Sequence, residues 1–169
     1  KKIKQKLHIP LNLEMAPTNE MLKIALKNKP DYVCIVPEKR KEVTTEGGLN
    51  LNRKTHFLKK MIKKLKHKGI RVSLFVEPRI SDIIKSKELN ADCVELHTGK
   101  FCNLINKKLN YKNEFNKIKK AAFYGNFLNL EVHAGHGLSY KSIKKISKID
   151  TIAEFNIGHF IVSESLFIG

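Results

Sequence analysis

Short apolar runs rich in β-branched residues alternate with longer amphipathic segments along almost the whole of this 169-residue chain. Most of these runs are nearly continuous in apolar residues, which is typical of parallel strands covered on both faces. We predict six strands, at residues 11–16, 33–37, 71–77, 93–97, 128–133 and 153–157. The connections after the second and fourth strands are the longest, and we expect extended loops there.

The segments between the runs have helical periodicity. In residues 56–67, for example, Leu58, Met61, Ile62 and Leu65 fall on one face, and Gly69 follows as a stop signal. The predicted helices are residues 19–27, 56–67, 81–87, 113–124 and 140–146, with a last helix that starts near residue 160. This βα repeat predicts an α/β fold with a parallel sheet, either an open doubly wound sheet or a (β/α)8 TIM barrel.

A closed barrel needs eight βα units and about 250 residues, whereas this sequence supplies about six units. If the fold is a barrel, we therefore expect an incomplete one. Residues 1–169 contain no low-complexity linker, so we expect a single domain.

The chain is strongly basic, with 33 Lys and Arg against 16 Asp and Glu and a net charge of +17. Such a balance is compatible with a nucleic-acid-binding module. However, arginine is confined to Arg40, Arg53, Arg71 and Arg79, and the lysines are scattered over predicted helix faces. We interpret the charge as a solvated surface that also favours anionic small molecules, and we expect neither a nucleic-acid nor a membrane partner.

The spacing of the cysteines and histidines argues against a disulfide framework and against a metal site. Cys34, Cys93 and Cys102 show no CxxC spacing, which favours free thiols in a reducing compartment such as the cytoplasm. The seven histidines include no HxxxH or HExxH pair, so we expect no metal site.

Among the carboxylates of the predicted strands, two are the most informative. Glu14 lies in the first predicted strand and Glu95 in the fourth. In α/β enzymes the active site lies at the carboxyl ends of the strands. Burial there raises the pKa of a carboxyl group towards neutrality, and such a pKa suits proton transfer. Both residues are therefore candidate catalytic groups, and a structural salt bridge is the alternative for each.

Histidines also occur at the strand ends. His136 lies between two glycines, where it has no evident packing role, so it is a candidate general acid or base. His133 and His97 lie within or just beyond predicted strands, where a packing role is equally compatible with the sequence.

Glycines follow the last two predicted strands. Gly135 and Gly137 flank His136, and Gly158-His159 opens the last helix. Barrels often bind phosphate with the loops after their final two strands and a helix N-terminus. The sequence therefore predicts a phosphate site at these residues.

Together these motifs resemble the pyridoxine 5′-phosphate synthase family of vitamin B6 biosynthesis. The matching stretches follow the family's order: Asn12-Leu-Glu-Met-Ala16, Val36-Pro-Glu-Lys-Arg40, Thr44-Thr-Glu-Gly-Gly-Leu49, Val72-Ser-Leu-Phe75, Glu95-Leu-His-Thr-Gly99, Ala134-Gly-His-Gly-Leu138 and Asn156-Ile-Gly-His159. The resemblance implies a TIM-barrel transferase, or ring-closing synthase, that needs no cofactor. It would condense 3-amino-2-oxopropyl phosphate with 1-deoxy-D-xylulose 5-phosphate to give pyridoxine 5′-phosphate, phosphate and water.

The resemblance also implies roles for individual residues. Glu14 would be a general base, His136 a general acid, and Glu95 would stabilise cationic imine-like intermediates. Thr44 would bind the deoxyxylulose phosphate. The phosphate of the amino ketone would be held by Gly137, Gly158 and His159. The family also implies a cytoplasmic homo-oligomer, usually an octamer.

The sequence departs from the family in two respects. The family's first two strands and most of its last helix are absent, so we expect this sequence to be part of a longer chain. His133 stands where the family usually has Asn, which would change hydrogen bonding near residues 134–137. Another phosphate-binding barrel enzyme, an isomerase or aldolase, is the main alternative. A Schiff-base lysine would favour that alternative, but the only strand-end lysine is Lys39, which fits a charged loop better.

Overall fold

The computed structural model describes residues 2–37 and 47–168. Within these ranges it contains one parallel sheet, in which neighbouring strands follow one another in chain order from β1 to β6. The strands are β1 Asn12–Met15, β2 Tyr32–Ile35, β3 Arg71–Val76, β4 Cys93–His97, β5 Glu131–Gly135 and β6 Glu154–Asn156. The predicted six-stranded parallel sheet is thus confirmed.

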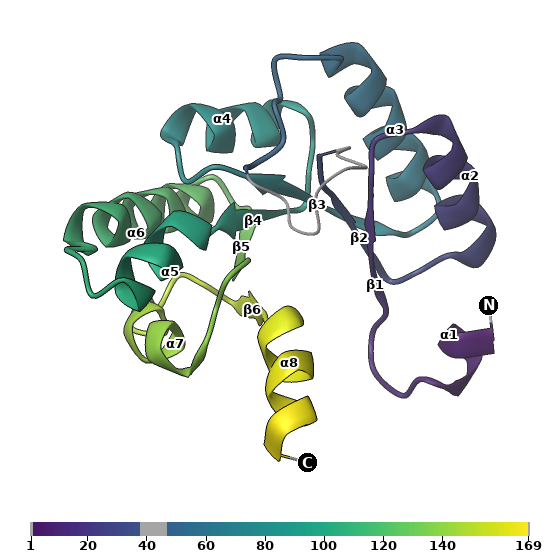
Figure 1. The fold of residues 1–169 in the computed structure, drawn as a ribbon. Coiled ribbons are helices and arrows are strands. Elements are labelled where there is room, and N and C mark those ends of the chain that lie inside the picture. The colour runs from purple at the N-terminus through teal and green to yellow at the C-terminus, as the bar shows by residue number, and fades with distance from the viewer. Residues whose placement is uncertain (1, 38–46, 169) are drawn as a thin grey trace.

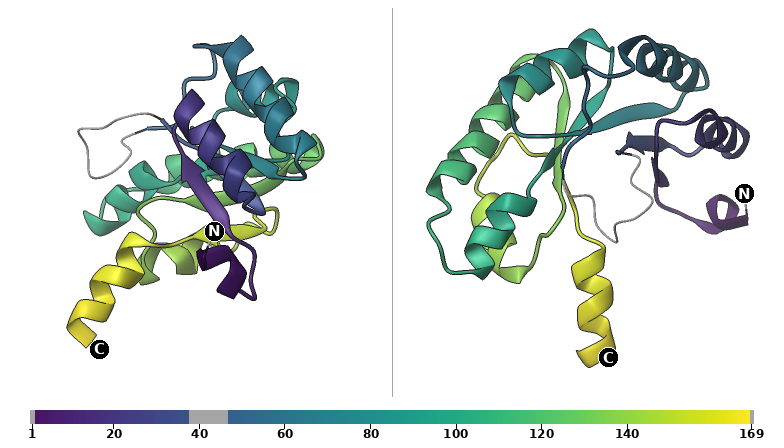
Figure 2. Two further views of the ribbon diagram at one scale, coloured as in Figure 1. Left: turned by 90° about the vertical axis from the view of Figure 1, so that its right-hand side faces the viewer. Right: turned by 45° about the horizontal axis from the view of Figure 1, so that its top comes forward.

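The sheet is curled, and most of the helices lie along its outer side, whereas the C-terminal helix projects away from it (Figure 1). Figure 2 shows the strands following an arc that is open on one side, with β1 and β6 at its two ends. The fold is therefore part of a (β/α)8 barrel, and the doubly wound alternative is wrong. No helix in the described part of the chain is long and apolar enough to cross a bilayer.

All six predicted helices are present, with small differences in their bounds. The described helices are α1 Lys2–Lys6, α2 Asn19–Asn28, α3 Thr55–His67, α4 Ile80–Glu88, α5 Gly99–Asn106, α6 Lys112–Phe127, α7 Tyr140–Ile146 and α8 His159–Ile168. The connection after β4, which we expected to be an extended loop, contains the unpredicted helix α5. The short helix α1 was also not predicted.

The boundary between α6 and β5 differs from the prediction. Gly125 does not end α6, which continues to Phe127, so β5 begins at Glu131 instead of residue 128. The reason is packing between helix and sheet. A Cβ atom at Gly125 would lie 2.8 Å from Cγ2 of Val132, so this glycine allows α6 to approach β5 closely.

Alternation along the strands separates an apolar outer face from a polar inner one. On β3, Val72, Leu74 and Val76 belong to the buried apolar cluster beneath the helices. The strand register aligns the intervening positions, for example Phe75 with Glu95 and Glu95 with His133. The inner face therefore carries rows of polar side chains that lead up to the carboxyl ends of the strands.

Candidate active site

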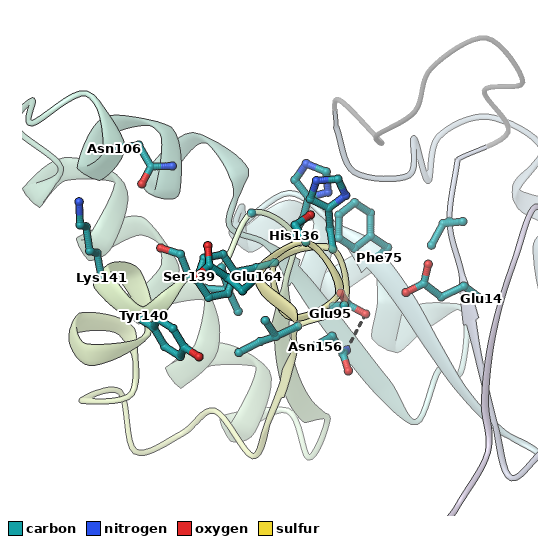
Figure 3. A pocket seen from close by; sticks show the side chains of 18 of the residues that line it. Glu14, Phe75, Glu95, Asn106, His136, Ser139, Tyr140, Lys141, Asn156 and Glu164 are labelled. Atoms are coloured by element: carbon teal, nitrogen blue, oxygen red, sulfur yellow. Dashed lines mark hydrogen bonds between the residues drawn. The ribbon is translucent and has the colours of Figure 1, made fainter. Parts of the chain in front are cut away.

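A cavity of about 1120 Å³ lies at the carboxyl ends of the strands. It brings together six of the seven predicted site residues, which come from both ends of the arc (Figure 3). These are Glu14, Glu95, His136, Gly137, Gly158 and His159. The seventh, Thr44, and the strand-end Lys39 lie outside the described residues.

Glu95 is the buried carboxylate of the cavity, with 4% of its surface exposed. Its Oε2 atom accepts a hydrogen bond of 2.9 Å from the amide of Asn156 (Figure 3). The same oxygen accepts one of 3.4 Å from the thiol of Cys34. Burial raises the pKa of Glu95 to about 7, the negative charge of Glu14 adds to the increase, and the two donors oppose it. Glu95 can therefore exchange a proton near neutral pH.

The glycine next to His136 provides the space for this carboxylate. A Cβ atom at Gly135 would lie 2.0 Å from Oε1 of Glu95, far inside contact distance. The absence of a side chain at Gly135 on β5 therefore leaves room for the carboxylate of Glu95 on β4. We expected Gly135 to help bind an anion, whereas the space beside its Cα is occupied by the Glu95 carboxylate.

Glu14 lies in a different environment from the one we expected. Its side chain is exposed, because β1 is an edge strand of the described sheet and its inner face opens into the cavity. The expectation of a buried carboxylate is thus wrong at this position. Its carboxylate nevertheless points into the cavity from the β1 side, facing the part that contains Glu95 (Figure 3).

His136 is held in a turn that a non-glycine residue seldom adopts, with φ of +76°. The buried Thr98 fixes this turn. Its hydroxyl lies 2.7 Å from the carbonyl oxygens of both Gly135 and His136, and its N–H donates to Gly135 O at 2.9 Å. Burial lowers the pKa of the half-buried His136, and the neighbouring His97 and His159 lower it further.

The predicted phosphate residues line the same cavity. Gly137 has φ of +76°, and a Cβ atom there would lie 3.2 Å from Cβ of Cys102. Gly158 directly precedes α8, whose first residue is His159. The cavity therefore contains a glycine turn and the N-terminus of a ten-residue helix, and both can offer backbone N–H groups to an anion.

Sequence reasoning missed two residues that contact Glu95. Cys34 was interpreted only as a small apolar side chain, yet its thiol reaches Glu95. Asn156 was quoted within a motif but given no role. The signal was its place at the end of the last strand, where an amide would face the inner side.

A second polar cluster lies on the inner face of the sheet, away from the cavity lining. Glu131 bonds to Nε2 of His133 at 2.8 Å and to Arg71 at 3.1 Å, and both interactions lower its pKa. His133 thus turns towards Glu131 and not towards residues 134–137. Cys93, Glu131 and His133 have the composition of a metal site, with ligand atoms within 4.8 Å of one another.

The contacts of Glu131 make this cluster an ion-pair network. Glu131 already has two partners, one of them the cation Arg71. Burial raises the pKa of the Cys93 thiol to about 12.

A strand-end cavity of a (β/α)8 barrel that holds two carboxylates, an imidazole and the N-terminus of a helix defines an enzyme of the barrel class. Comparison with known proteins gives the family. The model of the pyridoxal phosphate biosynthesis protein PdxJ matches residues 1–169, and the chain belongs to this family of vitamin B6 biosynthetic enzymes. This family match does not favour the alternatives of an isomerase, an aldolase or a nucleic-acid-binding module.

Similar curated proteins carry the name pyridoxine 5′-phosphate synthase, and two of them illustrate the match. The protein from Pelagibacter ubique is 56% identical over 168 residues, which cover 99% of this chain and 70% of the relative. The protein from Zymomonas mobilis is 52% identical over 161 residues, and this chain spans 62% of its length. Among solved structures, a xylose isomerase domain protein from Planctomyces limnophilus matches 90% of this chain and 63% of its own, with a TM-score of 0.54 and 12% identity, which shows the fold alone.

Proposed function

We propose that this chain carries the acid–base machinery of a pyridoxine 5′-phosphate synthase. The reaction condenses 3-amino-2-oxopropyl phosphate with 1-deoxy-D-xylulose 5-phosphate and releases pyridoxine 5′-phosphate, phosphate and water. The observation that carries the proposal is the convergence of Glu14, Glu95 and His136 on one cavity. The family membership and the names of the relatives support the same reaction.

The chemistry requires several proton transfers around one cavity. Imine formation, elimination of phosphate, ring closure and loss of water each move a proton. Glu14 acts as the general base and His136 as the general acid. Glu95 stabilises the cationic imine-like intermediates, and its burial strengthens that interaction because the surroundings screen charge poorly. No organic or redox cofactor takes part in this scheme.

The two substrates are both phosphorylated, and the positive net charge favours their approach. Gly137, Gly158 and His159 hold the phosphate of the amino ketone. Backbone N–H groups of the glycine turn and of the first turn of α8 supply the donors. Thr44, which lies outside the described residues, binds the 1-deoxy-D-xylulose 5-phosphate.

The resemblance extends the proposal to the whole protein. Residues 1–169 form one structural unit within a longer barrel, and the protein assembles as a homo-oligomer, an octamer by analogy with the family. The three buried cysteines are free, which agrees with a cytoplasmic location. Light scattering on the full-length protein tests the oligomeric state.

Product formation from the two phosphorylated substrates tests the function, with the full-length protein and its Glu14→Gln variant. We expect the variant to lose about 10²- to 10⁴-fold in kcat, the range for removal of a general base. Glu20→Gln, an exposed position on α2, is the matched control and should keep full turnover. Full turnover by Glu14→Gln would disprove the general-base role, and no product from the wild-type protein would disprove the function.

A further inference from the structure

Glu77 and His97 form a carboxylate–imidazole pair next to His136, and neither of them lines the cavity. Oε1 of Glu77, the residue that follows β3, lies 3.1 Å from Nδ1 of His97. The same oxygen accepts the backbone N–H of Gly48 at 2.8 Å. The hydrogen bond with His97 lowers the pKa of Glu77. An ionised carboxylate can only accept, so Nδ1 of His97 carries the hydrogen in this pair.

The opposite nitrogen of His97 has no such partner. Nε2 is buried and makes no hydrogen bond with any described residue, and only 9% of the side chain is exposed. The ring packs against Phe75 with centroids 5.2 Å apart and against His136 with centroids 4.8 Å apart. The only hydrogen bond that orients the His97 ring within the described residues therefore comes from Glu77.

Gly99, at the start of α5, makes the contact between the two imidazoles possible. A Cβ atom at this position would lie 2.7 Å from Nε2 of His97 and 2.8 Å from Cδ2 of His136. Any larger residue would push both rings away. The two imidazoles thus pack against each other beside Gly99, and the orientation of one ring constrains the orientation of the other.

We propose that Glu77 and His97 are positioning residues for His136: the Glu77 carboxylate fixes the His97 ring, and the His97 ring fixes the orientation and acidity of His136. The inference rests on the proposed function in that His136 is the general acid. Two imidazolium rings this close repel each other, so a positive charge on one disfavours a charge on the other. His97 thereby helps His136 to give up its proton.

Other titratable groups also face His136. They are Cys102 on α5, whose thiol lies 3.8 Å from the His136 carbonyl oxygen, and His159 at the start of α8. Glu77 acts on His136 only through His97. The variant that isolates the proposal is therefore His97→Phe, which keeps an aromatic ring against Phe75 and Gly99 but removes both nitrogens.

Imidazole ¹⁵N spectra of the full-length protein, recorded over a pH range without substrates, test the proposal. In the wild-type protein, neutral His97 should carry its hydrogen on Nδ1. In His97→Phe, the titration midpoint of His136 should move upwards by roughly 0.5 to 1 in pH, because a repelling neighbour is gone. The limb of the kcat profile that reports His136 should move in the same direction. His8→Asn, at an exposed position in the N-terminal segment, is the control and should change neither quantity.

Two results would overturn the inference. One is neutral His97 with its hydrogen on Nε2 in the wild-type protein, a measurement that needs no variant to fold. The other is a His136 midpoint that is the same in His97→Phe and in the wild type. Both measurements are made without turnover, so a protein that forms no pyridoxine 5′-phosphate would count against the proposed function alone.

Discussion

Oε1 of Glu95 occupies the space in which a side chain at position 135 would begin. The atom lies 2.0 Å from the position of a Cβ built on Gly135, and the carboxyl carbon lies 3.0 Å from it. The two residues are on neighbouring strands, with Glu95 paired to His133 and His97 paired to Gly135. The absence of a side chain at position 135 therefore determines where the carboxylate of Glu95 can lie.

We expect Gly135→Ala to displace the Glu95 carboxylate. The new methyl group cannot coexist with Oε1, so either the side chain of Glu95 rotates or the strands separate. The substitution should destabilise the protein by about 1–3 kcal/mol, the usual range for overpacking, and lower kcat by at least about tenfold. Urea unfolding and product formation measure the two effects.

A double-mutant cycle separates this contact from general damage to β5. Glu95→Ala removes the clashing oxygen, so adding Gly135→Ala to it should have much less effect on stability than adding Gly135→Ala to the wild type. Activity should remain low in the double variant, because the carboxylate is gone. Additive losses of stability would show that the methyl group at position 135 clashes with something other than Glu95.

The raised pKa of Glu95 predicts a specific dependence of stability on pH. Its pKa is about 7 in the folded chain against an ordinary value of 4.5, so the folded state holds a proton that the unfolded state has lost between these values. The contribution of Glu95 is fully present below pH 4.5 and is lost as the pH rises through 7. Integrated over this window, the loss is on the order of 3 kcal/mol.

Glu95→Gln should remove that loss. The free energy of unfolding of the variant, measured with urea, should exceed that of the wild type at pH 8 and approach it at pH 4.5. Glu20→Gln, which changes an exposed carboxylate, controls for the general effect of one fewer negative charge. A difference between wild type and Glu95→Gln that stays constant from pH 4.5 to 8 would refute the raised pKa.

Asn156 should tune the proton affinity of Glu95. Its amide donates to Oε2 at 2.9 Å and lowers the pKa of Glu95, opposing burial. Asn156→Ala removes this donor, so the pKa of Glu95 should rise further and the limb of the kcat profile that depends on ionised Glu95 should move to higher pH. Asn113→Ala, an exposed position on α6, is the control. An unmoved profile in Asn156→Ala would mean that this hydrogen bond does not affect the reactive carboxylate.

Much of the fold was accessible from the sequence because short, largely buried strands alternate with amphipathic helices, and both patterns are easily recognised. Strand β4 and helix α7 have the predicted bounds. Prediction failed where a local signal competed with packing. Gly125 resembles a helix stop, but it lies inside α6. It is a glycine because Val132 leaves no room for a side chain there. Helix α5 was missed since its eight residues begin with a glycine and follow a strand directly.

The candidate site was accessible to the extent that its residues stand at strand ends. The inner row that includes Glu95 follows from alternation and parallel register alone. The exposure of Glu14 could not be predicted, because it depends on which strands cover β1 and not on the residues of β1. The contacts of Gly135 and Asn156 with Glu95 depend on the stagger between strands, which residue types do not reveal.

Thr98 should be required for the turn that carries His136. It is completely buried, and its hydroxyl lies 2.7 Å from both carbonyl oxygens that flank the turn. Thr98→Val keeps the shape but leaves these carbonyls without that donor, so we expect a loss of about 1–3 kcal/mol in the free energy of unfolding. Because the turn has φ of +76° at His136, its loosening should also misplace the imidazole and lower kcat. Thr98→Ser retains the hydroxyl and should recover most of both quantities in urea unfolding and product assays. If Thr98→Val matched the wild type in stability and kcat, the hydroxyl would have no part in holding His136.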